Sequence, residues 1–408
     1  MCTENVTQSK YKLNITVLYF IFIILGIITG LSDIVILHDV AAVISEIFIK
    51  IFKFISLPII SLSLIVTLSQ VNADKEMNKA WQKTLFYTIT TTIIAASVAF
   101  ILYLIIAPAN IITQPKSIDM PIASSTNYLV YLMKLVPENI LAPFLEHQVI
   151  GVLLVSIIVG IAIRYIPDGD AQKTIGGFFK GIHGVFLVIT GWVVKIIPIA
   201  LYGFIATTIM QFKGGMDFAG LSGYLMVVVL ANIVQGFIVL PIFLSIYKIQ
   251  PFMTLRSMMP ALSVAFFSKS SAGTLPVTMQ TAENNLNVSP KISRFVLPLC
   301  TSINMNGCAA FIFTTVIYIM QNNGIEVSLM TMLLWIIIAT IAAIGNAGVP
   351  MGCFFLSISL LTSMNVPVAL LSVILPFYSI IDMIETALNV WSDSCVAVVV
   401  DKQTKQAI

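Results

Sequence analysis

Three carboxylates lie in the last long apolar stretch of the chain, which reads SIIDMIETALNVWSDS over residues 379–394. They are Asp382, Glu385 and Asp393, with Thr386 and Asn389 between them. One carboxylate at the centre of a bilayer costs roughly 2.5–3.5 kcal/mol on insertion scales. At about 100° per residue, these polar residues share an arc of about 100° on a helix, opposite a face of Ile, Met, Leu and Val. We therefore expect this face to point at a cavity, an ion or cationic partners.

Two other apolar stretches are interrupted by small and polar residues. Residues 268–279 read SKSSAGTLPVTM, and residues 345–353 read GNAGVPMGC. Unsatisfied backbone cannot face lipid, so such breaks survive where protein or a water-filled cavity surrounds them. Two re-entrant hairpins meet this requirement, and paired interruptions indicate a transporter site built from inverted repeats. Their helix N-termini would offer N–H groups to an α-carboxylate. A Gly/Pro kink in a spanning helix is the alternative for either break alone.

The stretch between these breaks contains TSINMNGCAAF, residues 301–311. Asn304 and Asn306 are amides in apolar surroundings, and Gly307 favours local unwinding. Unwound carbonyls and an amide oxygen are good ligands for a hard monovalent cation. The alternative role of these amides is polar contact between helices.

The composition indicates what kind of protein must position these groups. Of 408 residues, 58% are hydrophobic and 10% are charged, and the mean hydropathy is +1.01. Soluble proteins carry about 25% charged residues. Apolar runs long enough to span a bilayer recur from end to end, which is typical of membrane helices. The sequence therefore predicts an all-α polytopic membrane protein.

The apolar runs and the basic residues predict spans and orientation. Helices are expected at 14–36, 41–71, 82–107, 125–166, 172–208, 219–249 and 367–400, with irregular regions at 252–286, 290–321 and 327–362. Lys and Arg concentrate in alternate connections, at 10–12, 75–83, 164–180, 248–256, 291–294 and 402–405. By the positive-inside rule, both termini should be cytoplasmic, in a plasma (inner) membrane.

Other classes of function have little support. The net charge of +3 comes without a dense basic patch, so no nucleic-acid partner is expected. The three histidines are isolated and the five cysteines form no CxxC pair, so no cofactor is expected. No Ser/Lys, Asp/Asp or His-metal pair stands at catalytic spacing, so we predict that the chain is not an enzyme. A channel would need a continuous polar pore across several spans, whereas the polar residues here cluster.

These motifs resemble those of the glutamate transporter family, the dicarboxylate/amino acid:cation symporters. SSAGTLPVTM and GNAGVPMG resemble the two hairpin tips, NMNGCA is similar to the family's NMDGT motif, and DMIETALNVWSD resembles the last-helix motif D-x-x-R-T-x-x-N-V-x-x-D. The resemblance covers nearly the whole chain. It implies the glutamate-transporter fold, with eight transmembrane helices, two re-entrant helical hairpins and inverted repeats, in a homotrimer surrounded by membrane lipid.

The resemblance also divides the chain into a scaffold and a mobile transport domain. The scaffold would comprise residues 14–71 (helices 1–2) and 125–208 (helices 4–5). The transport domain would comprise helix 3 at 82–107 and residues 219–400, including hairpin 1 at 252–286, helix 7 at 290–321, hairpin 2 at 327–362 and helix 8 at 367–400. It would move as a rigid body across the bilayer in an elevator mechanism, with the second hairpin as a gate.

The family's binding residues carry over by motif. Asp382 would hold the substrate ammonium, and Thr386 and Asn389 would contact the substrate carboxylate region. Caps on the α-carboxylate would come from Ser270, Ser271 and the Val349–Gly352 stretch.

The resemblance also implies cation positions for sodium. One would use Asn304, Asn389, Asp393 and the backbone near Cys300. Backbone near Ser302 and in the second hairpin would form another. A third would lie at Asn306, with Thr88, Thr91 and Thr92.

Three departures from the family pattern matter more than the agreements. The NMDGT aspartate is Asn306, and losing that charge weakens attraction for a third cation. The NMDGT threonine is Cys308, a poor partner for a side-chain carboxylate. The last-helix arginine that clamps an acidic side chain is Glu385. An anion there would repel glutamate or aspartate.

Three interpretations of Glu385 remain open at this level. It would face a cationic or polar substrate side chain, or it would form a salt bridge with Lys269 and leave a neutral pocket. Alternatively, it would be protonated at times and couple transport to H⁺. We predict a sodium-coupled amino acid symporter that prefers neutral or cationic substrates. The alternative is a proton-coupled symporter of glutamate, aspartate or other dicarboxylates in the same fold.

Overall fold

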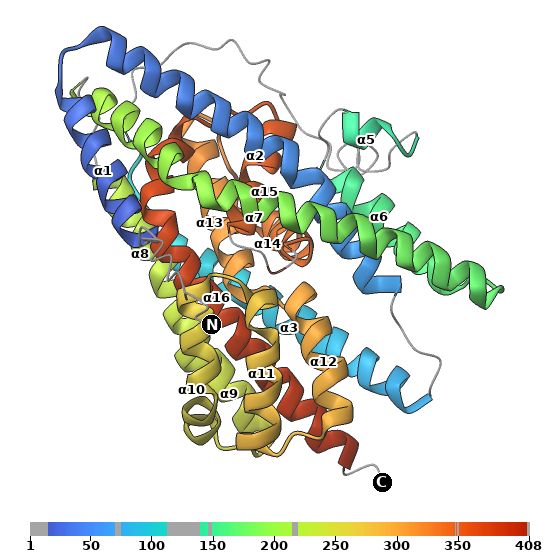
Figure 1. Ribbon diagram of the computed structural model, residues 1–408. Coiled ribbons are helices and arrows are strands. Elements are labelled where there is room, and N and C mark those ends of the chain that lie inside the picture. The colour runs from blue at the N-terminus through green and yellow to red at the C-terminus, as the bar shows by residue number, and fades with distance from the viewer. Residues whose placement is uncertain are drawn as a thin grey trace, which may run out of the picture.

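The computed structural model describes residues 15–69, 75–111, 139–145, 149–213, 219–346, 348 and 351–405. All regular structure in these ranges is helical (Figure 1). The first half contains α1 (Ile15–Leu31), α2 (Val35–Ser69), α3 (Lys75–Ile106), α5 (Ala142–Leu145), α6 (Val149–Arg164) and α7 (Gly169–Lys213). The second half contains α8 (Ala219–Val234), the π-helix η1 (Gln235–Val239), α9 (Leu240–Ile246), α10 (Pro251–Ser268), α11 (Ser271–Leu286), α12 (Pro290–Ile303), α13 (Asn306–Asn322), α14 (Leu329–Ile344), α15 (Gly352–Ser363) and α16 (Ala369–Lys405).

The all-helical class predicted from the sequence is confirmed, with adjustments at helix ends and breaks. The helix expected at 41–71 begins at Val35, and the helix expected at 172–208 extends over α7. Much of the 125–166 region, including residues 125–138 and 146–148, lies outside the described residues. The helix expected at 219–249 is interrupted by the π-helical turn η1. Within the described ranges, the helices follow the order that the sequence predicts.

Five described helices are long and apolar enough to cross a membrane by length and composition, namely Lys79–Ile106, Gly169–Val193, Gly220–Ile246, Pro290–Asn322 and Ala369–Lys405. Shorter apolar helices accompany them. The protein is therefore an integral membrane protein. The count of eight spanning helices and the re-entry of the two hairpins stay predictions.

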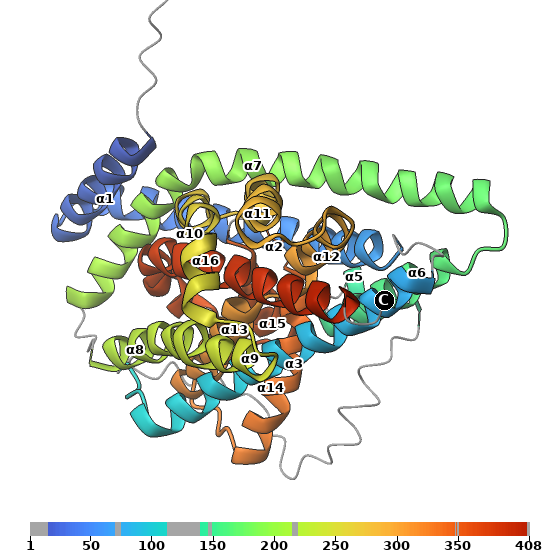
Figure 2. The same ribbon diagram turned by 90° about the horizontal axis from the view of Figure 1, so that it is seen from below.

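The helices form layers around α13 and α16. On one side, α7 packs along both α1 and α2, and α6 packs on α2. On the other side lie α3, α8 and α9, so that α16 runs between the two groups (Figure 2). Helices α10, α11 and α12 pack against α16 along its C-terminal half (Figure 1). The most hydrophobic part of α12 and α13 is entirely buried. The polar groups within it therefore lie in the interior of the protein.

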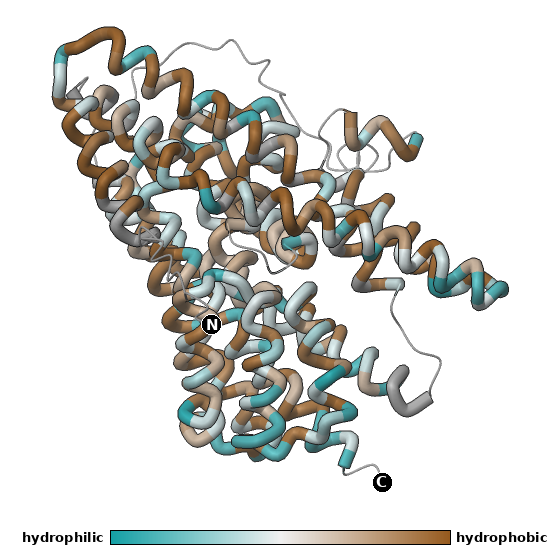
Figure 3. Tube along the Cα trace, viewed as in Figure 1, coloured by the Kyte–Doolittle hydropathy of each residue, from teal (hydrophilic) through white to brown (hydrophobic). Residues whose placement is uncertain are grey.

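Hydropathy separates two regions of the molecule (Figure 3). The helices α1 and α2 are mainly apolar, while polar residues gather at the end of the bundle that carries the C-terminus (Figure 3). Large apolar side chains also face outward, for example Ile36, which is 74% exposed, and Ile105, which is 73% exposed. Outward-facing side chains of this kind are expected where helices meet lipid or other subunits.

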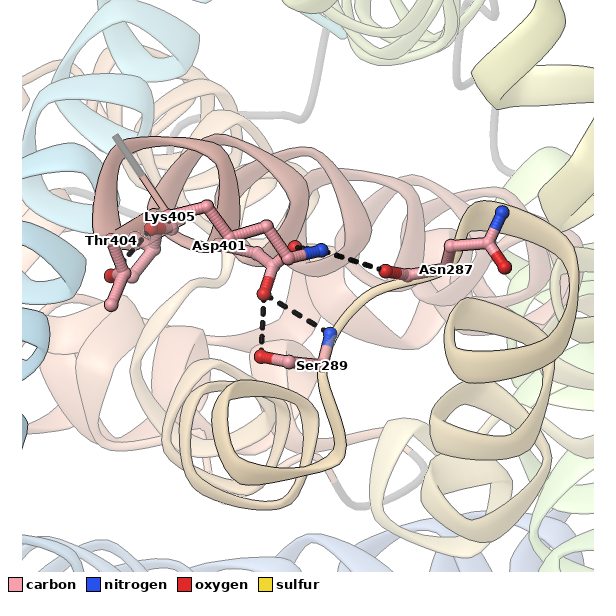
Figure 4. Close-up of polar contacts among 6 residues, drawn as sticks. Asn287, Ser289, Asp401, Thr404 and Lys405 are labelled. Atoms are coloured by element: carbon pink, nitrogen blue, oxygen red, sulfur yellow. Dashed lines mark hydrogen bonds and ion pairs between the residues drawn. The ribbon is translucent and has the colours of Figure 1, made fainter. Parts of the chain in front are cut away.

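The end of α16 fastens the turn between α11 and α12 (Figure 4). Asp401 Oδ1 accepts hydrogen bonds from Ser289 N at 3.0 Å and Ser289 Oγ at 2.6 Å. Lys405 pairs with Asp401 Oδ2 at 2.7 Å and donates to Asn287 O at 3.0 Å. One turn earlier, Lys402 donates to Tyr247 O at 3.0 Å, beyond α9. We call these contacts the C-terminal clasp.

Candidate substrate and cation site

The two sequence breaks form helix–turn–helix tips, and these tips meet. Lys269 ends α10 in the left-handed conformation at φ 55°, and Ser270 caps α11 by accepting from Gly273 N at 3.0 Å. Gly348, at the second tip, lies at φ +63°. Its carbonyl accepts from Ser270 Oγ at 3.2 Å and from Ala272 N at 3.2 Å. A Cβ on Gly348 would lie 2.8 Å from Thr301 O, so a residue without a side chain is required where the tips approach α12.

Asp382 on α16 is directed at the second tip. It is 3% exposed, and its Oδ2 accepts from Met351 N at 3.1 Å. Met351 holds this N–H in place through a left-handed conformation, φ 63°, immediately before α15. Thus an acidic side chain lies at the N-terminus of α15, where backbone N–H groups and the helix dipole attract anions. The Tyr378 hydroxyl donates to Asp382 Oδ1 at 3.4 Å.

Glu385 is buried one turn further along α16. It is 1% exposed, and its Oε2 lies 3.3 Å from the Tyr378 hydroxyl, whose single proton is shared with Asp382. Its Oε1 is buried and has no hydrogen-bond partner among the described residues. Cys353 and Cys308, from α15 and α13, neighbour this carboxyl group. An unpaired oxygen in such a place is costly unless a ligand or a proton satisfies it.

Lys269 approaches the same region from the first tip. Its Nζ donates to Ser379 Oγ on α16, and its charge attracts Asp382. These contacts differ from the expected salt bridge with Glu385, which stays a prediction.

The other predicted substrate residues lie on the first turn of α11, on α16 and at the start of α15. Ser271 is buried on the first turn of α11, and Asn389 Oδ1 accepts from Gly307 N at 2.9 Å. The Thr386 hydroxyl donates to Asp382 O at 2.7 Å, within its own helix. A Cβ on Gly352 would overlap Asn346 Oδ1, so the start of α15 requires glycine. Val349 lies outside the described residues.

The predicted cation residues meet at the break between α12 and α13. The break falls at Asn304 and Met305, with ψ values of 69° and 66°, whereas the sequence pointed to Gly307. Asn304 Nδ2 donates to Asp393 Oδ1 at 3.0 Å, and Cys300 O accepts from Asn304 N at 2.7 Å. Ser302 is half-buried on the last turn of α12. The Asp393 carboxylate, the Asn304 amide and the Cys300 carbonyl thus lie together at the break, with the NH₂ group of Asn304 toward the carboxylate. Carboxylate and carbonyl oxygens are ligands that hard cations prefer.

The threonines of α3 contribute unequally. Thr91 Oγ1 lies 3.2 Å from Asn304 Oδ1, to which it donates, and 3.2 Å from Thr88 O within α3, which shares its proton. The hydroxyls of Thr88 and Thr92 instead donate to carbonyls of α3, Thr84 O at 2.6 Å and Thr88 O at 2.7 Å. Thr91 therefore connects α3 to the predicted cation residues through its side chain.

Sequence reasoning missed three residues of this site. Tyr378 bridges Asp382 and Glu385, Ser392 accepts from Asn304 Nδ2 at 2.9 Å, and Gln235 donates to Asn306 Oδ1 at 2.6 Å. Gln235 and Ser392 are polar residues within apolar stretches, and this pattern could have indicated that both belong to a buried polar site. Their partners lie far away in sequence, so spacing alone did not reveal the contacts.

Buried carboxylates and amides between two broken helices, within a bundle of apolar helices, are characteristic of membrane transporters. This chain belongs to the sodium:dicarboxylate symporter family, whose model matches residues 15–403. The resemblance found in its motifs is therefore confirmed, and with it the glutamate-transporter fold class. Transporters are in general not enzymes.

Three relatives illustrate the range of the family. A putative sodium-dependent excitatory amino acid transporter, glt-4, of Caenorhabditis elegans is 26% identical over 96% of this chain and 90% of its own length. The neutral amino acid transporter B(0) of Mus musculus is 28% identical over 60% of this chain, which spans 45% of that protein. The proton/sodium-glutamate symport protein of Geobacillus stearothermophilus is 26% identical over 94% of this chain and 93% of its own length. These relatives differ in substrate and in coupling ion.

Proposed function

We propose that this protein is a sodium-coupled amino acid symporter that selects neutral or cationic amino acids over acidic ones. The observation that carries the proposal is the buried carboxyl group of Glu385 beside Asp382. An acidic substrate would bring a further negative charge into this enclosure, where like charges repel strongly. A substrate with a hydroxyl, amide or ammonium group would instead donate a hydrogen bond to Glu385 Oε1.

The remaining contacts support an amino acid as the substrate. Asp382 would bind its ammonium group, and the N-terminus of α11 with the hydroxyls of Ser270 and Ser271 would bind its α-carboxylate. Thr386 and Asn389 would orient the same end of the substrate. Selectivity would then depend on the side-chain end, where Glu385 takes the place of the family's arginine.

Sodium is the proposed driver. Asn304, Asn389, Asp393 and the carbonyl of Cys300 supply the oxygen ligands that a sodium ion prefers, and Ser302 would contribute its carbonyl to a second position. Two of the relatives are sodium-dependent or sodium-linked by name. The proposal includes a homotrimer in which residues 219–400 and helix 3 carry the substrate across the membrane in an elevator movement, with the second tip as the gate.

A proton-coupled glutamate symporter is a second candidate. The relative from Geobacillus stearothermophilus, a proton/sodium-glutamate symport protein, matches this chain over nearly its whole length. In this version Glu385 would carry a proton when the substrate is bound. The neutral carboxyl group would then donate a hydrogen bond to an acidic side chain.

Binding to purified protein distinguishes the two candidates. Thermal unfolding is recorded with each of the twenty amino acids, ornithine and cystine, with and without sodium, since a ligand that binds the folded state stabilises it. The proposal expects sodium-dependent stabilisation by a neutral or cationic amino acid. Stabilisation by glutamate that strengthens at low pH and needs no sodium would contradict it and support proton coupling.

A further inference from the structure

We propose that the side-chain amide of Gln235 replaces a cation beside Asn306, so that transport uses one sodium ion fewer than a carboxylate at position 306 would allow. This inference rests on the proposed sodium coupling. It concerns a group of buried side chains from four helical elements, which are α3, η1, α13 and α16, joined at the break after α12.

The amides form a continuous relay. Gln235 Nε2 donates to Asn306 Oδ1 at 2.6 Å and to Thr91 O at 3.1 Å. Asn306 Nδ2 donates to Asn304 Oδ1 at 2.8 Å and to Ser392 Oγ at 2.8 Å. Asn304 Nδ2 donates in turn to Asp393 Oδ1 at 3.0 Å. Gln235, Asn304 and Asn306 are all 0% exposed.

The two ends of the relay fix its direction. A backbone carbonyl such as Thr91 O accepts hydrogen bonds and donates none, so the Gln235 atom that faces it must be the NH₂ group. A carboxylate such as Asp393 likewise accepts, so Asn304 must present its NH₂ group to it. Every amide between these ends then donates toward Asp393. A reversed amide would place two oxygens or two NH₂ groups in contact.

This direction uses the two asparagine oxygens that a cation beside position 306 would need, and it leaves Gln235 Oε1 buried without a hydrogen-bond partner among the described residues. Asn306 Oδ1 accepts from Gln235, and Asn304 Oδ1 accepts from both Asn306 and Thr91 Oγ1. Sodium is held by oxygen lone pairs, and N–H groups aimed at the same oxygens present positive partial charge to it. A carboxylate at position 306 has no N–H group to donate. Asn304 Oδ1 would then lose the hydrogen bond from residue 306 and would be available to a cation.

The π-helical turn η1 places Gln235 in this position. Leu240 N donates to Gln235 O across the turn, and Trp391 Nε1 on α16 donates to Gly236 O at 3.1 Å. Gly236 packs closely on α16, since a Cβ there would lie 3.3 Å from Leu388 Cδ1. Single π-turns inside α-helices frequently mark functional sites. Here the turn holds the Gln235 amide against α3 and α13.

The relay takes up the side-chain amide of Asn304, which also belongs to the first proposed cation position. At that position Asn304 would therefore offer its backbone carbonyl to the ion. The Gln235 amide donates to Asn306 Oδ1 and Thr91 O, whereas Asn389 Oδ1 accepts from Gly307 N. The charge of Asp393 remains available to one ion. Transport should therefore use one sodium ion fewer and should still depend on sodium through the ions at the other proposed positions.

The experiment uses substitutions that replace one amide of the relay by a carboxylate of nearly the same size. Sodium-to-substrate coupling is measured from reversal potentials in proteoliposomes for wild type, Asn306→Asp and Gln235→Glu. Gln403→Glu is the matched control, because Gln403 Nε2 also donates to α3, at Tyr87 Oη and 2.7 Å, away from the relay. We expect the coupling ratio to rise by one ion in either relay variant and to stay at the wild-type value in the control.

Sodium titration of thermal stability without substrate provides a second measurement. We expect a steeper sodium dependence in Asn306→Asp than in wild type, whether or not wild-type transport proves to need sodium. Unchanged coupling and unchanged sodium titration in folded relay variants would overturn the inference. In wild type alone, a thallium anomalous peak within the group Thr91, Asn304 and Asn306 would also overturn it. Wild-type transport that is independent of sodium would instead refute the proposed function.

Discussion

Replacing Glu385 by Gln removes the charge at the proposed specificity position and keeps the shape of the side chain. One hydroxyl, that of Tyr378, lies 3.3 Å from Glu385 Oε2 and 3.4 Å from Asp382 Oδ1. A substrate whose ammonium binds Asp382 would therefore place its own side chain within a short distance of Glu385. The change in relative affinity for acidic, neutral and cationic amino acids then measures how much of the substrate selectivity comes from the charge of Glu385.

The size of the effect follows from Coulomb's law. Two unit charges about 7 Å apart, at an effective dielectric constant of about 20, interact by about 2 kcal/mol. That energy corresponds to a factor of roughly 30 in affinity. Glu385→Gln should therefore strengthen aspartate binding by roughly 30-fold relative to binding of a neutral amino acid. It should weaken binding of a cationic amino acid by a similar factor.

Calorimetric titration of purified wild type and Glu385→Gln with aspartate, serine and lysine measures these ratios at saturating sodium. Glu283→Gln is a suitable control, because Glu283 lies on α11 and pairs with Arg294 at 3.3 Å, away from the substrate residues. An unchanged ratio of aspartate to serine affinity would refute the electrostatic reasoning. It would mean that Glu385 carries a proton in the bound state, as the second candidate function requires.

Three further predictions concern neighbouring parts of the molecule. Asp393→Asn should abolish or severely weaken the sodium dependence of substrate binding, and unchanged sodium activation in an uptake assay would remove Asp393 from the cation site. Gly307→Ala should cost about 1–3 kcal/mol of stability by overpacking, because its Cβ would lie 2.9 Å from Glu385 Cα; an unaltered melting temperature would show that α13 can shift. Asp401→Asn weakens charge-assisted bonds to Ser289 and should lower stability by about 1–3 kcal/mol, which thermal unfolding in detergent would detect; a melting temperature equal to that of wild type would contradict the proposed importance of the C-terminal clasp.

Periodicity was sufficient to place the polar face of α16. Asp382, Glu385, Thr386, Asn389 and Asp393 are all buried, as their shared arc predicted. The opposite side is less exposed than an ordinary lipid-facing surface, because helices pack around the second half of α16. Side-chain pattern within one helix therefore identified the buried polar residues, and neighbouring helices determined how far the burial extends.

Breaks in helices were harder to position than to detect. Gly and Pro signalled the tips after Ser268 and Ile344, where the structure ends α10 and α14. In the NMNG segment the unwound residues are Asn304 and Met305, before the glycine. A Cβ on Gly307 would collide with Asn232 and Glu385, so this glycine permits close helix packing and does not itself form the break.

The amide relay could not be predicted from the sequence. Gln235 and Asn306 are 71 positions apart, and their contact depends on a π-helical turn that has no simple periodic signature. The motif at position 306 did indicate a lost charge. It did not indicate which group would satisfy the remaining oxygen, because that depends on the packing of η1 against α16.

The C-terminal clasp has a consequence for the order in which the chain can fold. Ser289 and the Asp401 carboxylate that holds it are separated by 112 positions. During synthesis, the α11–α12 turn therefore reaches the membrane long before its fastening exists. The hydrogen bonds between Ser289 and Asp401 cannot form while α13 to α16 are being translated. They form only when the last turns of α16 have been synthesised. Nascent chains halted before Asp401 should accordingly expose this turn to protease, and full-length chains should protect it.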